Sequence, residues 1–365
     1  EFTQHEDKIM NLFNKGIKLT LAAIAVSSFI AGCGGEEAKE AAPVASASQN
    51  TAAPAPAAEP IVLKFGYENN PGEPFDEGAK KWQELLNERS KGTMKIELYP
   101  SSQLGSKTDI IDSMILGEDV ATLADGAFYA DRGVADFGII FGPFLFDSWD
   151  EAFKLNNSQW FKDEEKLLNE KGIKIAAANW KYGDRHTLTT KPVRSIEDLH
   201  GLKIRVATSE IFSEGMRVLG ATPTPMPLGD VYTALQQHTI DGVENPIPVL
   251  YNGKFYEVAK YLLLDAHIKN ITNIIVGTKF FNKLTPEQQT MLLETCQEAG
   301  EYQNSVVDKV EKELLEKMKA EGVEVIDPSE EFKADLKKAS LEFYTLPLTK
   351  TWTPNLYETV KANCK

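Results

Sequence analysis

The sequence predicts an α/β fold, because short apolar runs typical of strands alternate with segments of helical periodicity along the chain. The first apolar run covers residues 61–67, and Trp82 and Leu86 then lie four residues apart within an amphipathic segment, residues 75–89. The same alternation returns after residue 173. Since strands joined by helical crossovers pair in parallel, we expect a largely parallel sheet.

Further strands and helices are expected along the chain. The expected strands cover residues 95–99, 120–124, 173–180, 202–207 and 239–244. The expected helices cover residues 108–116, 208–219 and 228–238. An extended segment contains Pro223, Pro225 and Pro227, because proline fixes φ and has no amide hydrogen to donate to a helix.

One long helix is expected near the C-terminal end. Thr285, Pro286 and Gln288 provide an N-cap, a proline at the first helical position and a capping-box partner. Few helix-breaking residues follow before Gly322, so the helix would run for about ten turns. A helix of that length is able to brace two lobes.

The N-terminal part is typical of a secretory signal. Lys15 and Lys18 form a positively charged region before an apolar run. This run, residues 19–31, has 13 residues and is shorter than the roughly 20 residues that a membrane span needs. The run leads into Ile-Ala-Gly-Cys, which resembles the lipobox of bacterial lipoproteins, with Cys33 as the lipidated residue. We therefore expect a lipoprotein signal peptide within residues 1–32 and a protein anchored outside the cytoplasm by acyl chains.

Residues 33–60 consist almost entirely of Ala, Pro, Ser, Glu and Gly, and such a segment cannot bury enough apolar surface to fold. We expect a disordered tether between the lipidated cysteine and a globular body that covers residues 61–365. Residues 1–9 precede the first methionine and are interpreted as a cloning remnant or a misassigned start.

Composition and motifs exclude several classes of function. The net charge is −15, from 39 basic and 54 acidic residues, which disfavours binding to nucleic acid. The sequence contains no GxGxxG, Walker or GxSxG motif, and neither the three cysteines nor the five histidines have the spacing of metal ligands. We therefore predict that the protein is not an enzyme and needs no cofactor or metal.

Basic and polar residues within apolar strands or turns remain as candidates for a binding site. Arg205 alternates with aliphatic residues in a strand, and its planar guanidinium can bind a carboxylate through two hydrogen bonds. Arg185 follows an apolar strand together with Trp180 and His186, which add an aromatic wall and hydrogen-bonding groups. Asn245 offers both a donor and an acceptor. Taken alone, each of the two arginines and the asparagine is also explained as a surface, loop or turn residue.

These segments, in this order, resemble the substrate-binding proteins of tripartite ATP-independent periplasmic (TRAP) transporters of the DctP type. The resemblance covers residues 61–330. Its principal motifs are GDRHTLTTKPV, SIEDLHGLKIRV and GATPTPMPLGDVYTALQQHTIDGVENP, and YPSSQLGS and FYEVAKYL agree with them. It implies a periplasmic-binding-protein-like α/β fold of two lobes, joined by crossing strands and a long helix, with an organic acid bound in the cleft between them. Lobe I would comprise residues 61–182 and 271–310, and lobe II residues 183–270 and 311–365.

The resemblance also implies roles for individual residues. Arg205 would be the principal carboxylate clamp, Arg185 the second basic contact and Asn245 a hydrogen-bond donor. Asp125 matches a position where relatives often carry an acid that meets ligand hydroxyls, and Asn69 matches a polar contact. The expected ligand-binding residues are Arg205, Arg185, Asn245, Asp125, Asn69, His186 and Trp180.

The ligand is expected to be a sugar acid of the uronate, aldonate or keto-gulonate type, because Asp125 would repel a second ligand carboxylate. A C4-dicarboxylate stays open, since Arg185 and Arg205 together could balance two carboxylates, and sialic acid is a further alternative. Lys107 stands where relatives often carry an acid, which leaves that contact undecided. The resemblance implies TRAP membrane permease subunits as partners, although a sensor lipoprotein would use the same closure chemistry.

Overall fold

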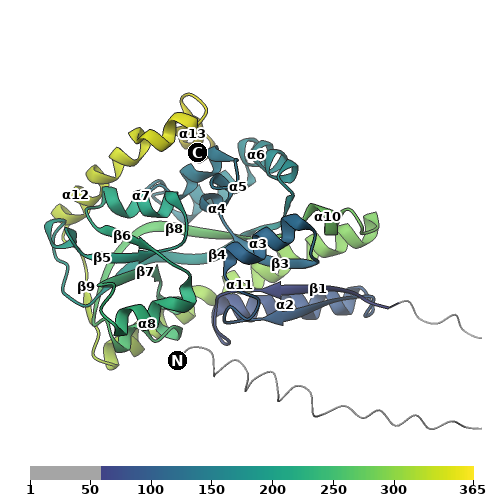
Figure 1. The fold of residues 1–365 in the computed structure, drawn as a ribbon, viewed down its shortest axis with the longest axis horizontal. Helices are drawn as coiled ribbons and strands as arrows, with labels where there is room; N and C mark the ends of the chain where they lie inside the picture. Colours follow the sequence, from purple (N-terminus) through teal and green to yellow (C-terminus); the bar gives the residue numbers. More distant parts are fainter. Residues whose placement is uncertain (1–58) are drawn as a thin grey trace, which may run out of the picture. The chain divides into compact units, whose positions relative to one another are not determined.

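The computed structural model describes residues 59–365, which are coloured along the sequence in Figure 1. The expected signal peptide, the lipobox Cys33 and all but the last two residues of the tether lie outside the described residues. No helix in the described part of the chain is both long enough and apolar enough to span a membrane.

Strands and helices alternate along the chain as the sequence predicts. The strands are β1 (Ile61–Gly66), β2 (Met94–Tyr99), β3 (Val120–Ala124), β4 (Ile173–Thr189), β5 (Lys203–Val206), β6 (Thr222–Pro225), β7 (Gly242–Pro246), β8 (Tyr261–Gly277) and β9 (Glu324–Ile326). The α-helices are α2 (Pro74–Arg89), α3 (Lys107–Leu116), α4 (Gly126–Ala130), α5 (Trp149–Asn157), α6 (Gln159–Glu170), α7 (Glu210–Val218), α8 (Val231–Gln236), α9 (Ile247–Asn252), α10 (Thr278–Phe281), α11 (Pro286–Ala320), α12 (Glu330–Ser340) and α13 (Leu356–Asn363). Each expected element is found close to its expected position, although the strand expected at residues 239–244 is β7 at Gly242–Pro246. The elements that the sequence analysis did not predict include β8, β9, the second half of β4 and the helices α4, α5, α6, α9, α10, α12 and α13.

The sheet consists of two parallel parts joined by an antiparallel centre. Its strand order is β2-β1-β3-β8-β4-β7-β5-β6, and β9 pairs with β8 outside this path. Strand β1 is parallel to both β2 and β3, and β5 is parallel to both β6 and β7. The pairs β3–β8, β8–β4 and β4–β7 are antiparallel. The expectation of a largely parallel sheet is therefore correct for the two outer parts and wrong for the centre.

The central pair, β4 and β8, runs from Ile173 opposite Gly277 to Thr189 opposite Tyr261. Each strand has 17 residues, so the pair extends through both parallel parts of the sheet. Its register shifts four times, including between the pairs made by Ala177 and Trp180. Such irregularities change which face of the sheet a side chain occupies.

The long helix α11 is confirmed, with 35 residues and a length of about 50 Å. Its capping box forms as expected: the Thr285 hydroxyl accepts from the Gln288 amide, and the Gln288 side chain accepts from the Thr285 amide at 2.9 Å. The helix packs on α2 and β4. In Figure 1, α2, α8 and α11 lie on one side of the sheet, and α5, α7, α12 and α13 lie on the other.

Three apolar clusters form the core. One lies between α2, α11, β1 and β4 and contains Trp82 and Trp180, which are both fully buried. The largest contains residues of both predicted lobes, such as Ile110 and Phe212. The third surrounds α8, α9 and the C-terminal half of α11. Cys296 and Cys364 are free, buried thiols in different clusters.

Candidate functional site

A small cavity of about 20 Å³ lies where the carboxyl ends of β1, β3 and β5 approach β4, β7 and β8. Ligands of α/β proteins commonly bind at the carboxyl ends of strands, because the connections there leave a crevice. The charged residues that line the cavity are Glu68, Lys107, Asp125, Arg185 and Arg205. The chain thus encloses three cations and two carboxylates in one small space.

Arg205 is a buried cation without a carboxylate partner. Its side chain comes from β5, and the residue is 3% exposed. Nε and Nη2 both donate to the backbone oxygen of Met226, at 2.9 and 2.7 Å. Among residues 59–365, no carboxylate lies within 4.0 Å of its nitrogens. Burial lowers the pKa of Arg205, although the charge of Glu68 opposes this.

Arg185, by contrast, is held by neighbouring side chains. Its Nε and Nη2 donate to the two carboxylate oxygens of Glu244, and Nη1 donates to Asn270 Oδ1 at 2.9 Å. Its guanidinium also lies 5.0 Å from the ring centroid of Phe212. Burial favours the neutral form, but Glu244 outweighs this effect and raises the pKa of Arg185. Much of the hydrogen-bonding capacity of Arg185 is therefore already used.

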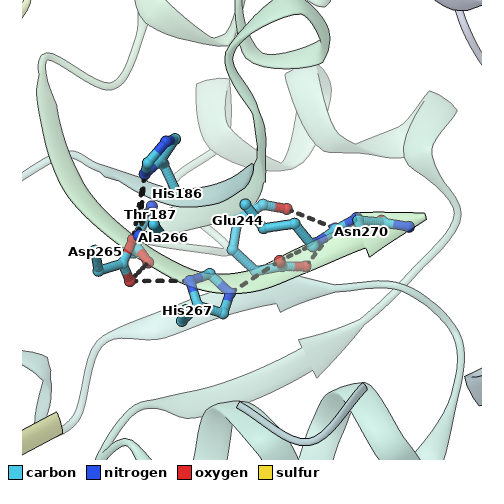
Figure 2. Close-up of polar contacts among 8 residues, drawn as sticks. His186, Thr187, Glu244, Asp265, Ala266, His267 and Asn270 are labelled. Atoms are coloured by element: carbon cyan, nitrogen blue, oxygen red, sulfur yellow. Dashed lines mark hydrogen bonds and ion pairs between the residues drawn. The ribbon is translucent and has the colours of Figure 1, made fainter. Parts of the chain in front are cut away.

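A buried network behind the cavity fixes Glu244 (Figure 2). The imidazole nitrogens of His267 lie 3.2 Å from Glu244 Oε2 and 3.0 Å from Asp265 Oδ2. Asp265 also accepts from the hydroxyl and the backbone amide of Thr187. Burial opposes charge on His267, but the two carboxylates raise its pKa to about 9. His267 is therefore an imidazolium at neutral pH and donates to both carboxylates.

Three further side chains present polar atoms to the cavity. Asp125 caps α4 by accepting from the Ala127 amide at 3.1 Å, and burial raises its pKa to about 6 against the charges of Lys107 and Arg185. Asn245 Oδ1 and Asn270 Nδ2 are buried and have no hydrogen-bond partner among the described residues. Because Asn270 Oδ1 accepts from Arg185, its amide orientation is fixed and Nδ2 is a free donor.

Glu68 and Lys107 form an ion pair at one wall of the cavity. Lys107 Nζ lies 3.6 Å from Glu68 Oε2 and 4.7 Å from the ring centroid of Phe128. Glu68 and Leu228 also border a larger, open groove of about 510 Å³ that reaches the surface. This groove is lined by loops of both parallel parts of the sheet and adjoins the cavity at these two residues.

Comparison with known proteins identifies the family. Residues 65–348 match the sequence model of DctP, bacterial extracellular solute-binding protein, family 7. The matched segment includes every residue that lines the cavity. The chain belongs to the DctP family.

Members of the DctP family with known ligands are similar to this chain along most of its length. The 2,3-diketo-L-gulonate-binding periplasmic protein YiaO of Escherichia coli is 36% identical over 72% of this chain and 80% of its own. A TRAP periplasmic solute-binding protein of Ochrobacterium anthropi with bound L-fuconate is 43% identical, with a TM-score of 0.80 over 84% of this chain and 100% of its own. Another, from Actinobacillus succinogenes with bound L-galactonate, is 39% identical, with a TM-score of 0.79 over 83% and 99%.

The structure brings four predicted site residues of this DctP-family chain together at the cavity. These four residues are Arg205, Arg185, Asn245 and Asp125. Three others do not line it. Trp180 is a core residue whose indole donates to the Cys296 carbonyl, and the His186 ring accepts from the Ala266 amide. Asn69 donates to Glu73 and Tyr182. These three residues therefore lie outside the lining of this cavity, and their expected contact with the ligand stays a prediction.

Several cavity residues of this DctP-family chain were missed from the sequence. Glu68 lines the cavity in place of its neighbour Asn69, and Lys107 does so although its role was left open. Asn270 also lines the cavity, while Glu244 stands behind it as the partner of Arg185. The only available signal was that Glu244 adjoins Asn245 in the same extended segment.

Proposed function

We propose that this chain captures a monocarboxylate sugar acid, with Arg205 as the clamp for the carboxylate. The observation that carries this proposal is the burial of Arg205 with a backbone carbonyl as its hydrogen-bond partner and no carboxylate beside it in residues 59–365. A buried cation without a counterion is costly, and a ligand carboxylate supplies the missing charge through two hydrogen bonds.

The charges around the cavity favour a single ligand carboxylate. Arg185 is neutralised by Glu244, and Lys107 is balanced by Glu68, so Arg205 is the cation left for the ligand. Asp125 would repel a second ligand carboxylate while it is ionised, and it accepts hydrogen bonds from hydroxyls. These features support a sugar acid over a C4-dicarboxylate. The ligands bound by the related proteins, L-fuconate and L-galactonate, agree with this choice.

The proposed mechanism is capture by closure. The acid enters between two lobes with the boundaries predicted above, contacts residues of both and thereby favours the closed arrangement. Closure excludes water and strengthens the pairing of Arg205 with the carboxylate. The closed complex then delivers the acid to TRAP permease subunits, and acyl chains on Cys33 keep the protein at the membrane. No bond of the ligand is broken, so the chain acts as a binding protein and not as an enzyme.

Isothermal titration calorimetry with L-galactonate and L-fuconate tests this function. We expect Arg205→Gln to weaken binding by 30-fold or more, because losing one partner of a buried charge pair costs about 2–5 kcal/mol. Arg194→Gln is the matched control, since Arg194 forms an exposed ion pair with Glu324. Failure of both acids to bind, or unchanged affinity in Arg205→Gln, would contradict the proposal. Binding of succinate in place of the sugar acids would favour the dicarboxylate alternative.

A further inference from the structure

We propose that the Glu68–Lys107 ion pair determines which group the ligand carries at the end opposite its carboxylate. The pair accepts a neutral hydroxyl there and rejects a second carboxylate. This inference rests on the proposed function, because it takes Arg205 as the residue that holds the first carboxylate. The ion pair would thus distinguish an aldonate, which has one carboxylate, from the corresponding aldarate, which has two.

The two residues reach the cavity from the part of the sheet that does not hold Arg205. Glu68 follows β1, and Lys107 is the first residue of α3, whereas Arg205 belongs to β5. Strands β1 and β5 lie in different parallel parts of the sheet. A ligand whose carboxylate is bound by Arg205 therefore extends toward Glu68 and Lys107.

The ion pair is almost enclosed, but its hydrogen-bonding groups are unused. The Glu68 and Lys107 side chains are each 11% exposed, and the distance of 3.6 Å between Nζ and Oε2 is too long for a good hydrogen bond. Neither side chain makes a hydrogen bond to another group in the described part of the chain. The ammonium and the carboxylate are thus a free donor and a free acceptor side by side.

A hydroxyl fits this arrangement because it accepts one hydrogen bond and donates another. A hydroxymethyl group can accept from Lys107 and donate to Glu68 at the same time. A methyl group at the same place leaves both charged groups without hydrogen bonds, and sites built around hydrogen bonds discriminate strongly against such analogues.

A second carboxylate fits poorly for two reasons. It can only accept hydrogen bonds, so it gains nothing from Glu68 and is repelled by it. The charge of Lys107 is already balanced by Glu68, and Asp125 adds a further negative charge to the same lining. Replacing Glu68 with a neutral amide would release Lys107 to pair with a ligand carboxylate.

Three ligands of one configuration separate these effects. L-Fuconate, L-galactonate and galactarate differ only at C6, which carries a methyl, a hydroxymethyl or a carboxylate group. For the full chain we expect calorimetry to rank L-galactonate first, L-fuconate at least 5-fold weaker and galactarate at least 100-fold weaker. Glu68→Gln should lower the ratio of L-galactonate affinity to galactarate affinity at least 10-fold. Lys107→Met should weaken galactonate at least 10-fold and change fuconate less than 3-fold.

Controls keep this inference separate from the proposed function. Lys283→Met removes a lysine from an exposed ion pair with Asp119 and should change no affinity. Lys107→Gln provides a second variant if Lys107→Met does not fold. Sugar-acid binding that needs Arg205, with the galactonate to galactarate ratio unchanged in Glu68→Gln, would overturn the inference and keep the function. Absence of binding by all three ligands would overturn both.

Discussion

Replacing His267 with asparagine should reduce the fall in the free energy of unfolding that occurs as the pH rises above 6.5. His267 lies between two buried carboxylates, at 3.0 Å from Asp265 and 3.2 Å from Glu244. Although burial opposes its charge, these carboxylates raise its pKa from the usual 6.5 to about 9. A group whose pKa is raised by folding stabilises the folded state fully below its unfolded pKa, and this contribution is lost as the pH rises through the folded pKa.

The magnitude follows from the same shift. One pKa unit corresponds to about 1.4 kcal/mol, so the raised pKa of His267 represents about 3 kcal/mol of stability that is present below pH 6.5 and lost by about pH 9.5. Glu244 acts in the opposite direction, because its pKa is lowered to about 2 and its contribution is lost only in acid, below pH 4.5. Between pH 4.5 and 6.5, the stabilising contributions of charged His267 and charged Glu244 are therefore both fully present.

Chemical denaturation at pH 6.5, 8 and 9.5 measures this effect. We expect the free energy of unfolding of wild type to fall by about 3 kcal/mol more than that of His267→Asn over this range. At pH 6.5 the variant should be less stable by about 3–5 kcal/mol, because it removes the cation beside buried Asp265 and leaves Glu244 with Arg185 alone. His186→Asn is the control, since burial lowers the pKa of His186, in the direction opposite to that of His267. Parallel curves for wild type and His267→Asn would refute this reasoning.

Other variants test the core and the long helix. Trp180→Phe should lower the free energy of unfolding by about 1–3 kcal/mol through loss of the indole hydrogen bond and packing, with ligand affinity by calorimetry changed less than 2-fold. Thr285→Ala should cost about 0.5–2 kcal/mol in chemical denaturation, because it removes the cap of α11. Cys296 and Cys364 should react with a thiol reagent only in denaturant, as mass spectrometry would show, since both are buried and burial raises the pKa of each thiol.

Local sequence patterns were sufficient to predict the elements whose structure depends on residues close together in the chain. The helix α11 begins at its capping box, and Arg205 lies on a short strand without irregularities, where alternation fixes its face. The positions of Trp180 and His186 could not be obtained in this way. Register shifts on β4 occur between Ala177 and Trp180 and between Arg185 and Thr187, so counting by two fails along that strand.

Strand β8 escaped prediction because its polar residues obscure the strand pattern. Asp265, His267 and Asn270 are buried on β8, where a sequence pattern normally shows apolar residues. Their burial is explained by partners on β4 and β7, such as Arg185 and Glu244, and those partners become neighbours only when the strands pair. The fold class was therefore predictable, whereas the polar network behind the cavity was not.

The central position of β8 also affects the order in which the chain can fold. Ala121 of β3 pairs with Val276 of β8, so the sheet that begins with β1 cannot be completed until the segment up to Gly277 is available. Pairing between such distant segments is slow, because much of the chain must be ordered before the contact forms. For a member of an extracellular protein family, this late completion leaves the newly made chain without a complete sheet during most of its synthesis, when it must still be able to cross a membrane.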